Sequence, residues 1–188
     1  MTQDKETIRE KLLKWDGILK DYSFPAWEDF PELPLYMDQV IYLLNQYLSF
    51  LPADGGERTV TPAMINNYVK MKIIPAPVRK RYGRTHLAYL MIVCVLKQVV
   101  NTCVIKTLLP PSPGEKEAQA LYAEFARTYG EIKDYFRREV RRAAEDVFGE
   151  QDEPVAHLVF QASAAANLSK MFTEQLILLE AEPGKAAE

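Results

Sequence analysis

The feature that most constrains the fold is an uninterrupted run of ten apolar residues, from Leu87 to Leu96. A helix that spans a bilayer needs about 20 such residues, so this run has about half the necessary length. Thr85 is a favoured N-cap just before the run, and the apolar character nearly all round predicts a helix that other elements surround. We therefore expect an all-α protein in which this helix is central.

Proline and helical periodicity divide the rest of the chain into further helices. Three prolines, at positions 25, 31 and 34, forbid a continuous helix and predict an ordered extended arm whose aromatic rings cover a core. A third helix is capped by Thr61, has Pro62 at its first position, and must end before Pro75. The full set of expected helices is 4–20, 38–49, 61–71, the central helix from 85, 103–109, 115–148 and a last one from 154.

The proline-rich segment PPSPG at 110–114 predicts the clearest boundary in the chain. We expect three parts: an N-terminal helix and arm (1–37), a helical module (38–110) and a long antiparallel helical hairpin (115–182). In the first helix of the hairpin, Phe125, Ile132, Phe136 and Val140 recur near the spacing of a coiled-coil seam and favour a homodimer. The alternative is that both helices pack within one monomer.

Charge is distributed very unevenly. The chain has 26 acidic residues and a net charge of −3, but none of the acids lies between Thr59 and Gly114. Together with Arg58, this segment carries nine cations, so the remaining residues sum to −12. A basic module inside an acidic protein predicts an anionic partner, and the alternative is a solvated basic face.

The short helix at 61–71 has a polar face. Helical spacing places Ile65, Tyr68 and Val69 on the inward side. The opposite side then holds Ala63, Asn66, Asn67 and Lys70. Asparagine pairs with adenine in the major groove, and lysine donates to guanine or to phosphate. The order of a helix, a loop and a short capped helix is typical of a helix-turn-helix, so this face is a candidate for reading DNA; the alternative is that the asparagines only face solvent.

The segment that follows, VRKRYGR, forms a candidate phosphate clamp. It holds four cations and a tyrosine in a turn bounded by proline and glycine. Arginine suits this task because its planar guanidinium binds two phosphate oxygens at once. We expect contacts to the phosphate backbone of DNA from five residues: Lys72, Arg79, Lys80, Arg81 and Arg84. We call the basic turn at 75–84 the wing. Tyr82 either bonds a phosphate or anchors the wing on the core.

Two stretches of this chain resemble known protein families. The stretches TPAMINNYVK and RYGRTHLAYL, within residues 30–110, resemble an uncharacterised bacterial family, domain of unknown function 1836, and more distantly the DNA-binding half of MerR-type regulators. The second resemblance implies a winged helix-turn-helix with Thr61 as the cap and Tyr68 as the packing tyrosine of its recognition helix. It also implies that Ile73–Ile74–Pro75 leads into a wing that ends at Arg81, Tyr82 and Arg84. Lys72 stands where such regulators have glycine.

No feature of the chain indicates an enzyme. Phosphate-binding loops, zinc-protease motifs and nucleophile elbows are all missing from the sequence. We expect no metal and no cofactor, because His86 and His157 lie far apart and the cysteines, Cys94 and Cys103, are predicted to be buried free thiols. The charged start of the chain predicts no signal peptide, and hence a cytoplasmic location.

Two functional hypotheses follow. The first is a DNA-binding transcriptional regulator, non-catalytic and dimeric, that contacts double-stranded DNA. The second is a protein-interaction module that keeps the helix-turn-helix layout without binding DNA.

Overall fold

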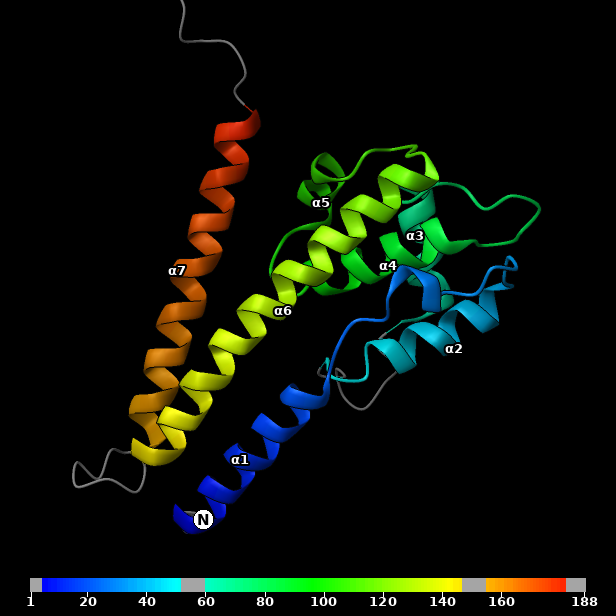
Figure 1. Cartoon of the computed structure of the whole chain (residues 1–188). Helices are drawn as coiled ribbons and strands as arrows, with labels where there is room; N and C mark the ends of the chain where they lie inside the picture. Colours follow the sequence, from blue (N-terminus) through cyan, green and yellow to red (C-terminus); the bar gives the residue numbers. More distant parts are fainter. Residues whose placement is uncertain (1–4, 52–59, 147–154, 182–188) are drawn as a thin grey trace, which may run out of the picture. The chain divides into compact units, whose positions relative to one another are not determined.

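The computed structural model describes residues 5–51, 60–146 and 155–181, and the regular structure in these ranges is helical. They form seven α-helices, one short 3-10 helix and two isolated β-bridges, with no strand in the described ranges (Figure 1). The expected all-α class is confirmed. Arg58 and the loop PADGGE at 52–57 lie outside the described residues.

The expected helices are present with small shifts at their ends. In chain order the elements are α1 (Lys5–Asp21), η1 (Trp27–Asp29), α2 (Met37–Tyr47), α3 (Pro62–Lys70), α4 (Arg84–Leu96), α5 (Thr102–Leu108), α6 (Glu115–Asp146) and α7 (Val155–Ala181). No helix in the described parts of the chain is long and apolar enough to cross a membrane.

The chain divides into two compact units. We call Asp21–Lys133 the core unit, and the described residues before Asp21 and after Lys133 the terminal unit. The division does not follow the proline-rich segment 110–114. Within the core unit Tyr89 of α4 donates a hydrogen bond to the Pro110 carbonyl at 3.1 Å, and Tyr122 of α6 is buried.

The core unit is built around α4, as the sequence predicts. Every residue from Leu87 to Cys94 is buried. Helices α2 and α5 pack against α4, and α2 also packs against α3. Of the two cysteines, Cys94 is buried, which confirms its prediction, whereas Cys103 on α5 is exposed. The prediction for Cys103 was wrong because α5 is a short helix with one fully buried position, Ile105.

The aromatic arm closes the core unit, as its composition predicts. Trp27 and Phe30 are buried, and the Phe30 ring lies 5.0 Å from the ring of Tyr122. Tyr122 also donates a 2.9 Å hydrogen bond from its hydroxyl to the Pro25 carbonyl. Such rings bury 150–250 Å² each, so a few of them hold this irregular segment in place.

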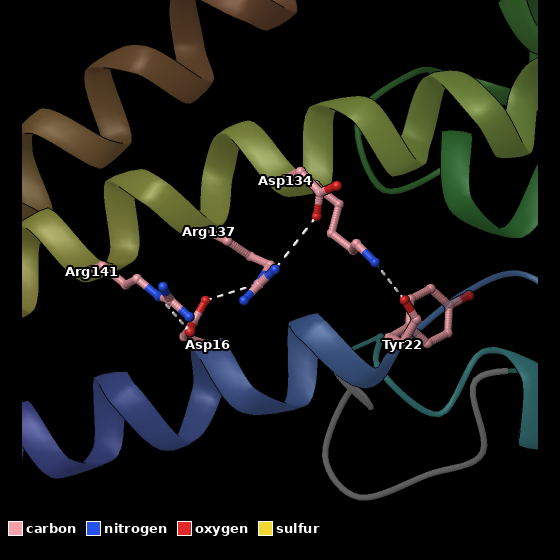
Figure 2. A network of polar contacts seen from close by, with 6 residues as sticks. Asp16, Tyr22, Asp134, Arg137 and Arg141 are labelled. Atoms are coloured by element: carbon pink, nitrogen blue, oxygen red, sulfur yellow. Dashed lines mark hydrogen bonds and ion pairs between the residues drawn. The ribbon is translucent and has the colours of Figure 1, made fainter.

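The terminal unit is held by a buried carboxylate. Asp16 of α1, with a side chain 7% exposed, accepts hydrogen bonds from Arg137 Nε at 2.9 Å and from Arg141 Nε at 2.8 Å (Figure 2). Burial tends to raise the pKa of Asp16, but the two guanidinium groups outweigh it and hold the pKa below its usual value. Val140 and Ala144 are buried beside this network.

Candidate nucleic-acid interface

Helix α3 presents the polar face that the sequence predicts. Thr61 caps it, since its hydroxyl oxygen accepts a hydrogen bond from the Met64 amide at 3.4 Å, and Pro62 occupies the first turn. Ile65 and Tyr68 are buried and Val69 is half-buried. Ala63, Asn66, Asn67 and Lys70 are exposed, so the expected orientation of this helix is confirmed.

The position of α3 depends on a residue that sequence reasoning missed. Asn45 of α2 accepts a hydrogen bond from the Val60 amide at 3.1 Å and donates one to the Val60 carbonyl at 3.2 Å. It also bonds the Ile41 carbonyl of its own helix at 2.8 Å. These contacts fix the start of α3 against α2. No local sequence signal marks Asn45, because its partner lies 15 residues away.

Helix α3 ends with a backbone conformation that normally requires glycine. The amide of Ile73 bonds the Tyr68 carbonyl at 2.9 Å, and the amide of Lys72 bonds the Val69 carbonyl at 3.0 Å. These two bonds define a Schellman motif in which Lys72 is the left-handed residue, with φ of 58°. A residue with a Cβ is disfavoured there, yet this chain places an exposed lysine at that position.

The wing contains two more residues of this kind. The amide of Arg81 bonds the Val78 carbonyl at 2.9 Å and closes a four-residue turn. Arg79 and Lys80, at the centre of the turn, have φ of 50° and 61°. Positive φ at both central residues defines a type I′ turn, which favours Asn-Gly. Both side chains are exposed at the tip of the wing.

The remaining wing cations, the exposed Arg81 and the half-buried Arg84, make contacts within the protein. Arg81 donates to the Pro34 carbonyl at 3.2 Å and to the Tyr36 hydroxyl at 2.6 Å, and its guanidinium carbon lies 3.7 Å from the centre of the Tyr36 ring. Arg84 donates to the Phe30 carbonyl at 2.9 Å. Both arginines therefore attach the wing to the aromatic arm, and Tyr36 is a partner that sequence reasoning did not identify.

Tyr82 and His86 form the base of the wing. Tyr82 is 3% exposed and pairs through its backbone with Leu35, by hydrogen bonds of 2.8 and 2.9 Å. Of the two alternatives for Tyr82, the structure therefore agrees with the anchor. His86 Nδ1 accepts from the Gly83 amide at 3.0 Å, which leaves the proton on Nε2, 3.4 Å from the Ala76 carbonyl. Burial lowers the pKa of His86, although the two backbone contacts oppose that shift.

The candidate residues thus fall into two groups. The first group consists of exposed side chains on α3, on the turn that ends it and at the tip of the wing: Asn66, Asn67, Lys70, Lys72, Arg79 and Lys80. Side chains that hold the wing on the arm or the core form the second: Arg81, Tyr82 and Arg84. Among the described residues, no three His, Cys, Asp or Glu side chains form a group that could hold a metal ion.

The core unit defines an all-helical domain with a short capped helix and a basic wing. Residues 25–131, more than half of the 188-residue chain, match the family described as a domain of unknown function, DUF1836. The chain therefore belongs to this family, whose description assigns no activity. The matched residues coincide closely with the core unit, Asp21–Lys133. No curated protein and no solved structure is significantly similar to the chain.

Proposed function

We propose that the protein is a non-catalytic, DNA-binding transcriptional regulator of MerR-like type that contacts double-stranded DNA through α3 and the wing. The main support for this proposal is a feature of the backbone. Lys72, Arg79 and Lys80 are the non-glycine residues with positive φ in the described chain, and all three are exposed cations in the segment without acids.

Left-handed backbone costs a residue with a Cβ about 1–2 kcal/mol, so glycine would make each of these positions more stable. Strained backbone of this kind concentrates at functional sites, where the side chain contributes something other than stability. Here the side chains contribute positive charge on exposed turns. Phosphate is the anion that such cations suit, since each phosphate contact releases bound counterions.

Double-stranded DNA is the phosphate partner that α3 favours. Asn66 and Asn67 are exposed on a helix of 9 residues that ends at Lys70, immediately before the Schellman turn. A short helix enters the major groove, where asparagine reads adenine, while cations on a neighbouring wing contact the backbone. In this arrangement the cations Lys70, Lys72, Arg79 and Lys80 contact phosphate and position the protein. Asn66 and Asn67 read the sequence.

Fluorescence anisotropy on labelled genomic fragments tests the proposal. We expect binding that weakens steeply with salt. Replacing Lys70→Gln and Lys72→Gln should reduce affinity about equally for all fragments and lower the salt slope by about 2, because two phosphate contacts are removed. A matched control, Lys106→Gln with Lys116→Gln, removes two exposed cations of the same unit and should leave binding unchanged.

A second candidate is a protein-interaction module without DNA binding. The internal contacts of Arg81 and Arg84 favour it, because they leave fewer cations for phosphate. Binding that cannot be measured at low salt would replace the first proposal with this one. Binding that both double variants weaken equally would exclude α3 and the wing as the DNA-contacting surface.

A further inference from the structure

Helix α7 is an apolar helix with very little cover from its own chain. It has 27 residues, and none whose side chain the structure describes is buried. Only Leu158, Thr173 and Ile177 are half-buried. At 100° per residue these three fall within about 100° of the circumference, so they mark the side that faces the chain itself.

The opposite side of α7 carries six large apolar side chains. They are Phe160, Leu168, Met171, Phe172, Leu178 and Leu179, which are 54–71% exposed. These positions fall within about 120° of the circumference, and Ala164 lies among them. We call this set the α7 stripe. Three polar residues, His157, Gln161 and Gln175, lie in the same arc, whereas Lys170 and Glu174 lie on a different side of the helix.

We propose that the α7 stripe binds the same stripe of a second copy of this chain and forms a two-fold symmetric dimer. The six side chains of the α7 stripe expose on the order of 700 Å² per chain, close to the roughly 800 Å² that each partner contributes to a stable interface. Monomeric proteins rarely expose a contiguous apolar surface of this size.

A second copy fits the stripe better than a charged partner does. A two-fold interface brings a surface against itself, so any charge on it meets a like charge. The α7 stripe limits this repulsion because its arc holds no Asp, Glu, Lys or Arg, and Ala164 allows a close approach of the two helices. On the same side the Gln161 amide nitrogen lies 2.8 Å from His157 Nε2, and Gln175 can hydrogen-bond across the pair.

The seam predicted on α6 is a weaker candidate for the same role. Val140 is buried, the Phe136 ring contacts Trp15 of α1 at 6.2 Å, and the Phe125 ring lies 5.3 Å from that of Phe24. Three of its four residues are therefore engaged within the chain. The dimer surface proposed here lies on α7, outside the matched residues 25–131, and does not depend on DNA binding.

Light scattering coupled to size-exclusion chromatography tests the proposal on the full chain. We expect twice the chain mass of 21.5 kDa at micromolar concentration. Leu168→Glu with Phe172→Glu should raise the dimer dissociation constant at least ~100-fold, because symmetry places four carboxylates in one apolar interface. Both side chains are 65% exposed, so circular dichroism should show an unchanged helix content.

Two further measurements make the result specific. Ser163→Glu with Lys170→Gln changes the charge of α7 by the same amount away from the stripe and should leave the dimer intact. Mixing the Leu168→Glu/Phe172→Glu chain with a Leu168→Lys/Phe172→Lys chain should restore a dimer that neither variant forms alone. A monomeric wild-type chain, equal effects of both Glu-containing variants, or no recovery on mixing would overturn the proposal.

Discussion

The sharpest prediction concerns the two cations at the tip of the wing, where stability and binding should change in opposite directions. Arg79 and Lys80 occupy the central positions of the type I′ turn, with φ of 50° and 61°. Asn and Gly are the residues that this turn favours. The double variant Arg79→Asn/Lys80→Gly therefore relieves backbone strain and removes two positive charges in one step.

The expected gain in the free energy of unfolding follows from the backbone conformation of these two residues. Left-handed φ costs about 1–2 kcal/mol per residue, and glycine returns about 0.5–1 kcal/mol of that through its freer unfolded chain. We expect the free energy of unfolding of the core unit to rise by about 1 kcal/mol, which is about 2–4 °C in Tm for a chain of this size. The magnitude of the salt slope of DNA binding should fall by about 2, because two phosphate contacts are lost.

The chain offers a clean assay for this change. It has two tryptophans: Trp27 is buried in the core unit, and Trp15 lies on α1. In a Trp15→Phe background, urea unfolding followed by Trp27 fluorescence reports on the core unit alone. Fluorescence anisotropy at several salt concentrations measures DNA binding of the same variants.

A charge-matched control separates the two effects. Arg79→Gln/Lys80→Gln removes the same charges and keeps the left-handed strain, so it should weaken binding equally without any gain in stability. If Arg79→Asn/Lys80→Gly is no more stable than this control, the strain argument is wrong. If it binds DNA as the wild type does, the wing tip does not contact phosphate.

Three further predictions concern single positions. Lys72→Gly should stabilise the core unit by about 0.5–1 kcal/mol in urea unfolding, because glycine suits the left-handed residue of the Schellman motif, and a loss of stability would contradict that reasoning. Asp16→Asn should destabilise the terminal unit by about 2 kcal/mol, because two guanidinium groups lose their buried partner, and Trp15 fluorescence in a Trp27→Phe background measures the loss. The pKa of His86 is lower in the folded protein than in the unfolded chain, where it is about 6.5. The neutral side chain therefore stabilises the fold fully above about pH 6.5, and this stabilisation is lost as pH falls through the folded pKa. His86→Gln should flatten core-unit stability over that pH range, and an unchanged pH profile would exclude His86 as the cause.

The sequence determined the helices of this protein and the location of its basic segment. The run from Leu87 to Leu96 predicted a central helix because no side of it suits water, and Leu87 to Cys94 are indeed buried. Thr61 and Pro62 predicted the start of α3 because capping is a local interaction. The charge pattern needed only the order of residues, since the segment without acids is continuous in the chain.

The tertiary structure decided which cations lie at the tips of turns and which hold the wing on the aromatic arm. Arg79 and Arg81 are two residues apart in one turn, yet Arg81 is placed on Tyr36, 45 residues away, while Arg79 lies at the tip. No local pattern distinguishes them, because the distinction depends on the aromatic arm reaching the wing. The left-handed conformation of Lys72 could not be predicted from the sequence either, because this type of turn normally has glycine at that position. The sparse cover of α7 also needed the folded chain, because an apolar helix in a sequence does not reveal what packs against it.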